Sequence, residues 1–357
     1  MKIEVWTWGT GGPFGRELGV GPNRRRRGHT ATSIVIPDGA AGGAAGAHIL
    51  VDVGAPSVER MIEAGVSPPD LVFLTHSHFD HLSDLDRLAN SRMRGLMVRA
   101  GVKDFERALK LFGPLPVIGT EDCLHHPEDG ARARFGYLGG LVSWRPLSGY
   151  DVWQRVRRPD GALSPEGSQR DGLSLAGAPR RSGGAIEGAS PERSGLPHTG
   201  GFFPFEVKAL PVHHSKHAPG SCLFLFRLSL GYVGSPGGDG PRFRNFVVSG
   251  DYKSMEEWVI ESPDLRDPAC LVLDTNTIKA SGDYHASLEE NRSLIDRWTS
   301  GEEEVLVLLN HLSGFGDFRK GFYDHVPDDE DWRAAAGFAT KPKVTVKIAE
   351  DGECHRI

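Results

Sequence analysis

Residues 69–81 read PDLVFLTHSHFDH, and this stretch decides the fold. Its first half is an apolar run rich in β-forming residues, which predicts a buried strand. Its second half places His76, His78, Asp80 and His81 within six residues, directly after that strand. In extended or turning backbone the H-x-H pair can point to one side, whereas Asp80 and His81 begin a helix and can face a second point. The complete H-x-H-x-D-H pattern at a strand-to-helix turn therefore predicts a cluster of ligands.

The residue types in this cluster suit a metal ion, since imidazole and carboxylate groups together bind Zn²⁺, Mn²⁺ or Fe. The alternative is a solvated polar loop in which Asp80 caps the following helix. That alternative accounts for the aspartate but not for three histidines at these spacings. We therefore favour a metal site.

Three other strand ends carry side chains of the same kind. A loop between two apolar runs holds His213, His214 and His217, while Asp251 and His311 each follow a further apolar run. Taken alone, each is an ordinary turn aspartate or polar histidine. Together they place six to seven ligands beyond the ends of four strands. That number is too large for one tetrahedral metal and fits two metals ~3.5–4 Å apart that share a carboxylate.

The remaining patterns predict an α/β (α+β) chain made mostly of strands, with helices at intervals. Strands are expected at 2–8, 30–36, 48–53, 69–75, 205–212, 222–230, 243–250, 270–275, 304–310 and 343–349. Helices are expected at 57–65, 81–90, 102–113 and 287–299. This order suggests two mixed β-sheets packed face to face with helices outside.

Residues 158–201 differ from the rest in composition, being rich in Gly, Ser, Pro, Ala and Arg with few large apolar side chains. Such a segment buries too little surface to offset its ordering entropy. Strands resume directly after it. We therefore expect a flexible insertion within a single domain that spans residues 1–357.

Composition excludes several classes of protein. Hydrophobic residues make up 39% and charged residues 25%, which excludes wholesale disorder. The net charge of −6 argues against a dedicated nucleic-acid coat protein. The four cysteines lie far apart, so reduced thiols are expected rather than disulfides or a Cys-based zinc site. Because there is no apolar leader and no run of 18 apolar residues, we expect a cytoplasmic protein without a membrane span.

Taken in order, the motifs resemble those of the metallo-β-lactamase superfamily. The resemblance rests on GTGG at 9–12, LTHSHFDHLSDL, ALPVHHSK, VVSGDYK, LVLDT followed by HASLE, and NHLSG. It covers nearly the whole chain and is greatest with the branch that holds ribonuclease Z and the cyclic phosphodiesterase of the carbon–phosphorus lyase pathway, the PhnP-like enzymes. The resemblance implies an αββα sandwich with a dimetal site at one edge of the two sheets.

The resemblance also implies roles for particular residues. His214 is expected to be the ligand rather than His213, because it precedes Ser-Lys as in the third motif of the family. Asp52 matches the first motif, and we expect it to orient a ligand histidine or its loop. His285 matches an active-site histidine that assists at the phosphate. By position alone, His285 could equally serve only to begin the helix at 287–299.

Two departures separate the chain from these relatives. Residues 10–30 lack the cysteines that form a structural zinc site in the carbon–phosphorus enzyme, and Phe79 stands where ribonuclease Z has glycine. The pocket is therefore not expected to copy either one. The segment GTGGPFG also lacks the Lys-Ser/Thr of a Walker loop, so it is only weak evidence for a phosphate-binding loop.

The expected chemistry is that of a hydroxide held between two divalent metal ions, Zn or Mn with Fe as a further option. One ion is assigned to His76, His78 and His214, the other to Asp80, His81 and His311, with Asp251 between them. The hydroxide would attack phosphorus or a carbonyl carbon, and the ions would stabilise the developing charge. Catalytic roles are expected for His285, Asp80 and Asp251.

The leading hypothesis is a dinuclear metal-dependent phosphodiesterase that acts on a small or cyclic phosphodiester. An imidazolium at His285 would bind the charged phosphoryl oxygen and protonate the alkoxide leaving group. The alternatives are hydrolysis of a thioester or lactone, ribonuclease Z-like RNA processing, and a non-enzymatic metal or redox module. We expect a small-molecule partner and no membrane partner. The net charge disfavours a nucleic-acid partner, and a homodimer is left open.

Overall fold

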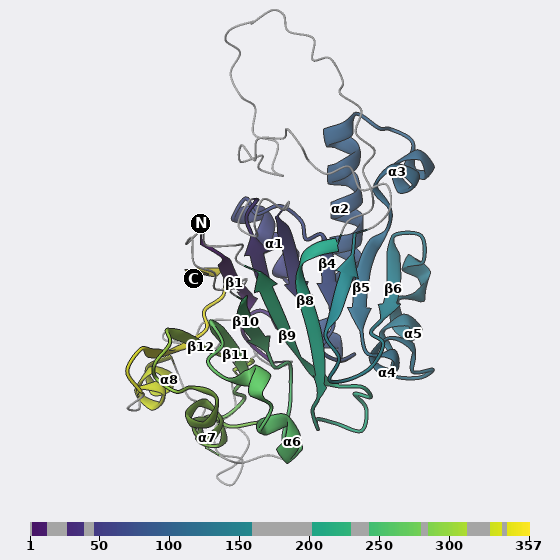
Figure 1. The fold of residues 1–357 in the computed structure, drawn as a ribbon. Coiled ribbons are helices and arrows are strands. Elements are labelled where there is room, and N and C mark those ends of the chain that lie inside the picture. The colour runs from purple at the N-terminus through teal and green to yellow at the C-terminus, as the bar shows by residue number, and fades with distance from the viewer. Residues whose placement is uncertain are drawn as a thin grey trace, which may run out of the picture.

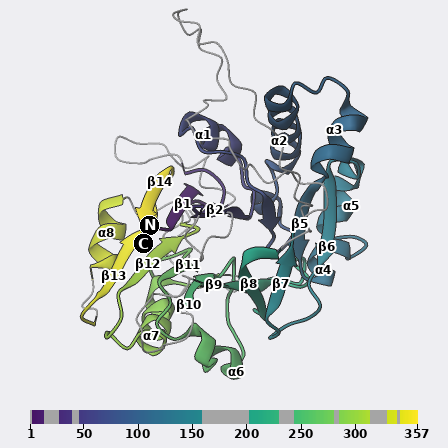
Figure 2. The same cartoon turned by 45° about the horizontal axis from the view of Figure 1, so that its top comes forward.

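The structure of the 357-residue chain is a computed structural model. It describes residues 2–12, 27–38, 46–158, 202–229, 243–279, 285–312, 329–337 and 341–357. Two β-sheets lie face to face, and helices lie on the outside of both (Figures 1 and 2). Nearly all of the predicted insertion, 159–201, lies outside the described residues.

The first sheet holds seven strands in the described part of the chain, in the order β14-β1-β2-β3-β4-β5-β6. Their bounds are β1 Glu4–Gly9, β2 Ala31–Ile36, β3 Ala47–Val51, β4 Leu71–Phe73, β5 Leu115–Gly119, β6 Val142–Pro146 and β14 Glu353–Arg356. Pairing is antiparallel from β14 to β3 and parallel from β3 to β6.

The second sheet likewise holds seven strands among the described residues, in the order β13-β12-β11-β10-β9-β8-β7. Their bounds are β7 Gln154–Arg157, β8 Phe202–Pro211, β9 Cys222–Ser229, β10 Phe243–Val248, β11 Cys270–Asp274, β12 Val305–Asn310 and β13 Val344–Ile348. Here β10 to β13 are parallel and β7 to β10 antiparallel. Each sheet therefore has a parallel half, in which the carboxyl ends of neighbouring strands meet at one edge.

Helices cover the outer faces. Their bounds are α1 Ser57–Glu63, α2 Leu85–Ala100, α3 Phe105–Phe112, α4 Glu121–His125, α5 Ala131–Phe135, α6 Glu257–Ile260, α7 Leu288–Trp298 and α8 Asp329–Ala336. Helices α1 to α5 lie on the side of the first sheet and α6 to α8 on the side of the second (Figure 2). The predicted fold class is thus confirmed: an α/β chain of two mixed sheets with helices outside, layered αββα.

Strands buried on both faces read as nearly continuous apolar runs, because neither side meets water. The β3 run AHILV is buried throughout, and so is the β11 run CLVLD. Between the sheets, Phe73 of β4 makes edge-to-face contacts with Phe205, Phe224 and Phe226, at ring-centroid distances of 5.0–6.2 Å. This aromatic cluster joins the strand that leads into the H-x-H-x-D-H motif to the opposite sheet.

Several elements differ from the sequence-based expectations. The helix expected at 81–90 begins later and runs longer, as α2. The backbone first closes a 3₁₀ turn at Phe79–His81, and the carboxylate of Asp84 accepts a hydrogen bond from the N–H of Val58 in α1. Strands β5, β6, β7 and β14 and helices α4, α5, α6 and α8 were not predicted. They are short, and β5 carries Pro116, a residue that argues against a central strand.

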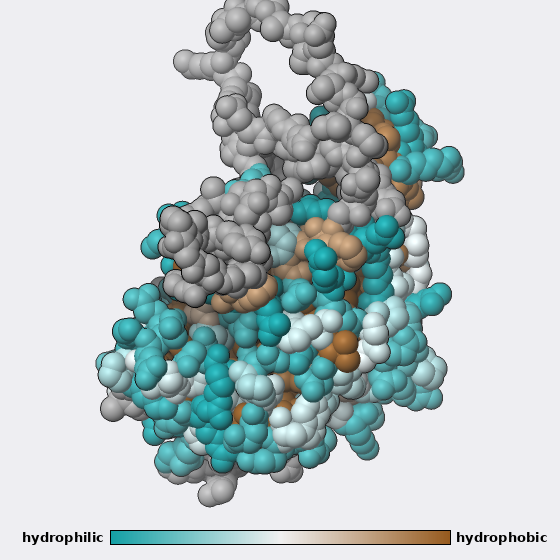
Figure 3. Space-filling view, viewed as in Figure 1, coloured by the Kyte–Doolittle hydropathy of each residue, from teal (hydrophilic) through white to brown (hydrophobic). Residues whose placement is uncertain are grey.

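The face of the molecule seen in Figure 3 is mostly hydrophilic, with apolar side chains gathered only in small patches. No helix in the described ranges is both long and apolar enough to cross a lipid bilayer.

Candidate metal centre

The parallel halves of the two sheets bring chemically related side chains to one place. Asp52 follows β3, and the H-x-H-x-D-H motif follows β4. On the other sheet Asp251 follows β10, Asp274 ends β11 and His311 follows β12. The chain reverses at these carboxyl ends, and both Asp52 and His311 have a positive φ, 58° and 56°.

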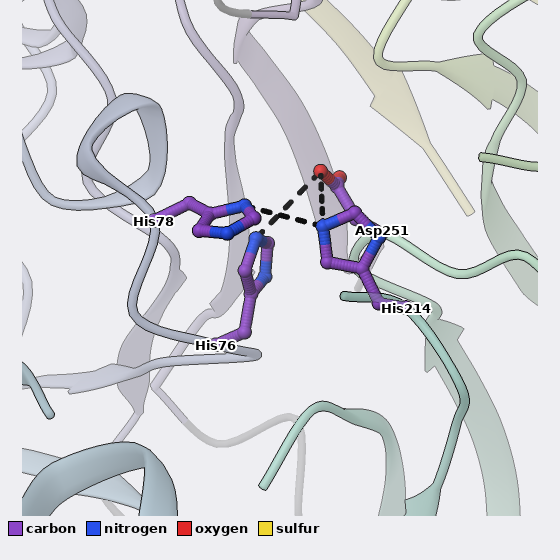
Figure 4. A group of neighbouring side chains, drawn as sticks. All are labelled: His76, His78, His214 and Asp251. Carbon is purple, nitrogen blue, oxygen red and sulfur yellow. Dashed lines mark hydrogen bonds and ion pairs between the residues drawn. The ribbon is translucent and has the colours of Figure 1, made fainter. Parts of the chain in front are cut away.

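One group of donors consists of His76, His78, His214 and Asp251, whose ligand atoms all lie within 4.8 Å of one another. The four side chains come from both sheets and point toward a common centre (Figure 4). Oδ2 of Asp251 lies 3.6 Å from Nε2 of His76 and 3.8 Å from Nε2 of His214. Nδ1 of His78 lies 3.2 Å from Nε2 of His214. Three imidazoles and a carboxylate are thus arranged around one point.

A second group consists of Asp80, His81, His311 and again Asp251, all buried. Nε2 of His311 lies 3.4 Å from Oδ2 of Asp80 and 3.2 Å from Oδ2 of Asp251. Nε2 of His81 lies 3.2 Å from Oδ1 of Asp251 and 3.7 Å from Oδ2 of Asp80. Asp251 belongs to both groups: its Oδ1 faces His81, and its Oδ2 faces His311 as well as His76 and His214. It therefore lies where a carboxylate shared between two metal ions would lie.

Asp52 lies behind the second group. Its Oδ2 is 2.8 Å from Nδ1 of His81, and it also accepts hydrogen bonds from the N–H and the hydroxyl of Thr75, at 2.9 and 2.8 Å. With Nδ1 of His81 engaged by Asp52, Nε2 faces the centre. The position agrees with the expectation that this aspartate orients a ligand histidine and its loop.

A third group adds two residues to the edge of the site, His285 and Asp274, which join Asp251 and His311. Oδ2 of Asp274 lies 3.2 Å from Nδ1 of His285, and its Oδ1 lies 3.3 Å from Nδ1 of His311. The two imidazole rings stack at a centroid distance of 4.8 Å. Sequence reasoning did not assign a role to Asp274, although LVLDT was among the motifs quoted. The sequence signal for Asp274 is its place at the carboxyl end of an apolar strand. That strand is the one that runs beside, and parallel to, the strand before His311.

The pKa values of the histidines differ between the first and the second donor group. Burial lowers the pKa of His78 to about 4, helped by the neighbouring His214. Burial, together with His81, also holds the pKa of His76 well below its usual value. Both histidines are therefore neutral near pH 7, the form that binds a metal.

In the second group, burial acts to lower the pKa of His311, but the carboxylates of Asp251, Asp274 and Asp80 outweigh it and raise that pKa to about 10. Burial would raise the pKa of Asp251, yet His311 and His81 hold it well below its usual value. A cation that enters this group must displace protons from the imidazoles that balance the carboxylates.

The donor set fits a metal on the evidence of its own unpaired atoms. Among the described residues, Nε2 of His76 and Nε2 of His81 are buried and make no hydrogen bond, although carboxylate oxygens of Asp251 lie 3.6 and 3.2 Å from them. A buried polar atom without a partner carries a free-energy penalty of about 1–3 kcal/mol, which coordination would remove. The residue types, imidazole and carboxylate, suit divalent ions such as Zn²⁺ and Mn²⁺.

Of the three histidines in the β8–β9 loop, only His214 reaches these groups. Nε2 of His213 lies 2.8 Å from the carboxylate of Glu256 on the surface, and Nδ1 of His217 lies 3.9 Å from Asp129. The side chains of His213 and His217 are exposed, whereas that of His214 is buried. All seven expected ligands therefore belong to the two groups that share Asp251, and His285 lies beside them.

Comparisons with known proteins found one sequence match, to a part of the chain. Residues 41–105 match the family model described as Metallo-beta-lactamase superfamily. No curated protein matches the chain.

Three solved structures are similar over nearly the whole chain. The first is a new diphosphatase from the PhnP family (TM-score 0.57, 16% identity, 100% of this chain and 98% of that one). The second is Zn²⁺-bound PqqB from Methylobacterium extorquens (TM-score 0.53, 11% identity, 99% of each chain). The third is a long form RNase Z from yeast (TM-score 0.53, 11% identity, 99% of this chain and 41% of that one). At these identities the likeness is one of fold, and residues 41–105 are the part of the chain that is similar in sequence to the metallo-beta-lactamase superfamily.

Proposed function

We propose that the protein is a dinuclear metal-dependent phosphodiesterase that acts on a small or cyclic phosphodiester. The observation that carries the proposal is the geometry around Asp251: two donor groups share this carboxylate, and His285 lies 3.6 Å from it. His76, His78 and His214 would hold one divalent ion, and Asp80, His81 and His311 the other. When bound, a pair of such ions lowers the pKa of a shared water and stabilises negative charge on phosphoryl oxygens.

The chain's own residues supply the remaining functions. Asp274 accepts a hydrogen bond from Nδ1 of His285, and the His285 ring lies between His311 and His214, at 4.8 Å from each. This fixes the ring and leaves Nε2 to face a substrate. When both ring nitrogens carry protons, Nε2–H can bind a phosphoryl oxygen and then protonate the departing alkoxide, a step worth about 10²–10⁴-fold in rate.

His285 is more exposed than the ligands around it: 22% of its side chain is open to solvent, against 0–2% for His76, Asp251 and His311. It is thus reachable from solvent, whereas these three ligands are not. The relatives also support chemistry at phosphorus, since a diphosphatase and an RNase both cleave bonds to phosphorus.

The test uses the full chain loaded with Zn²⁺ or Mn²⁺. We expect it to hydrolyse bis-p-nitrophenyl phosphate and a 2′,3′-cyclic nucleotide, to lose both activities with chelator, and to regain them on reloading. His285→Ala, loaded to the same metal content, should hydrolyse the cyclic nucleotide about 10²–10⁴-fold more slowly. No turnover with either metal at full loading would contradict the proposal. Faster hydrolysis of thioesters or lactones in a matched panel would replace it with carbon-centred hydrolysis.

A further inference from the structure

The glycine-rich segment at the end of β1 approaches the candidate metal centre at Gly12. A Cβ atom on this residue would lie 2.9 Å from Cε1 and 3.2 Å from Nε2 of His311, and 3.4 Å from Nδ2 of Asn276. Contacts below 3.0 Å are essentially never made by real Cβ atoms, so something must move if position 12 carries a side chain. The nearest atom is Cε1 of His311, and bonded to it is Nε2, the atom that faces Asp80 and Asp251.

The need for glycine here arises from space and not from backbone conformation. Gly12 is not among the described glycines with a positive φ, whereas Gly250, for example, has φ 57°. An alanine could therefore adopt the backbone conformation of Gly12. What excludes it is the ring of His311.

The segment that carries Gly12 has little freedom to retreat. Thr10 accepts the N–H of Leu312 through its carbonyl, at 2.7 Å, and donates its hydroxyl to Asp351, at 2.7 Å. Gly11 donates its N–H to the carbonyl of Gly28, at 2.8 Å, and is bridged to Leu312, the residue after His311. The approach of this segment to the centre is thus set by hydrogen bonds on both of its sides.

The ring of His311 has equally little freedom. It is buried, with Nδ1 held 3.3 Å from Asp274 and Nε2 held 3.2 Å from Asp251. The ring also stacks on that of His285. Because neither the Gly12 segment nor the His311 ring can move away freely, a side chain at position 12 would displace Nε2 of His311 from the second donor group.

We infer that Gly12 is a positioning residue for His311, and that its missing side chain is required for one metal position of the pair and not for the other. This inference rests on the proposed dinuclear site. In Gly12→Ala the position formed by Asp80, His81 and His311 should bind its ion about 10- to 100-fold more weakly, as when a group that orients a ligand is lost. The position formed by His76, His78 and His214 should keep the affinity of the wild type.

The first experiment measures metal content and stepwise Zn²⁺ affinity of Gly12→Ala, wild type and a matched control. Gly136→Ala is the control, because Gly136 also has an ordinary backbone conformation and a Cβ there would meet nothing within 4 Å. We expect one of the two binding steps to weaken in Gly12→Ala and neither in Gly136→Ala. Unchanged affinity at both steps, or equal loss at both, would overturn the inference.

The second experiment does not depend on metal. It compares the free energy of unfolding of metal-free His311→Ala with that of the double variant Gly12→Ala/His311→Ala. Because truncation of His311 removes the atoms nearest to the new Cβ, the double variant should be as stable as His311→Ala alone. Further destabilisation in the double variant would show that the side chain is excluded by something else. If the wild type bound no metal, the proposed function would fail, and this second comparison would still decide the role of Gly12.

Discussion

Nδ1 of His81 lies 2.8 Å from Oδ2 of Asp52, although 29 residues separate them in the sequence. The pair connects the carboxyl end of β3 to the motif that follows β4. Asp52 has a φ of 58°, a region that asparagine also tolerates. Asp52→Asn therefore preserves the backbone turn while it removes the charge that holds His81.

We expect Asp52→Asn to weaken metal binding about 10- to 100-fold, the usual effect of losing a partner that orients a ligand histidine. Titration of metal-free protein with Zn²⁺ measures this. Asp70→Asn is the control, because it makes the same change at an aspartate whose carboxylate accepts a hydrogen bond from the N–H of His48, outside the three donor groups. An Asp52→Asn protein with the affinity of the wild type would exclude this role.

Asp274 contacts two histidines of different expected function, His285 and His311. Asp274→Asn should therefore reduce both turnover and metal affinity, about 10- to 100-fold each. His285→Ala should reduce turnover and leave metal content unchanged, since the seven expected ligands remain. Parallel measurement of metal content and rate separates the two effects.

The leaving group supplies a sharper test of His285. A general acid matters most for a poor leaving group, so the loss in His285→Ala should be larger for an alkyl phosphodiester than for an aryl one. Rates over a series of phosphodiesters with graded leaving-group pKa values check this. An equal loss across the series would indicate that His285 binds substrate without donating a proton.

Phe73 ends β4 and Phe79 begins the 3₁₀ turn that follows this strand, and the burial of their side chains is opposite. Phe73 is fully buried among the phenylalanines between the sheets, whereas Phe79 is 61% exposed. Phe73→Ala should lower the free energy of unfolding by about 3–5 kcal/mol. Phe79→Ala should change it by less than about 0.5 kcal/mol. Urea denaturation of the two variants tests the pair, and a loss of similar size in both would contradict the packing described for β4.

Cysteine reactivity provides a test of burial across both sheets. Burial raises the pKa of the Cys270 thiol to about 12 and holds those of Cys123 and Cys222 above their usual value. For the less buried Cys354, burial raises the pKa of the thiol to about 11, and Glu4 adds to this shift. A raised pKa keeps a thiol protonated, and the thiolate is the reactive form.

At pH 8 we therefore expect all four thiols of the native protein to react slowly with an aromatic disulfide reagent, with Cys354 first. In guanidinium chloride all four should react at once. Rapid reaction of two or more thiols in the native protein would disagree with the burial of these strands.

The sequence by itself determined the parts of this protein that are local. Four of the seven expected ligands lie within six residues, so His76, His78, Asp80 and His81 could be recognised from their spacing after one apolar strand. The long apolar runs were recognisable for a similar reason, since strands buried on both faces leave no polar alternation in the sequence. These patterns predicted two sheets and a metal site beyond the ends of their strands, and the family resemblance implied that this site lies at one edge of both sheets.

Only the tertiary structure decided which distant side chains meet. The resemblance favoured His214 over His213, and the course of the β8–β9 loop is what brings the His214 side chain to Asp251. The contact of Gly12 with His311 joins positions 299 residues apart. The role of Asp274 became visible only when β11 was placed beside β12 in register, with Asp274 opposite Asn310. Such contacts arise because parallel strands gather their carboxyl ends at one edge of the sheet, wherever those strands lie in the chain.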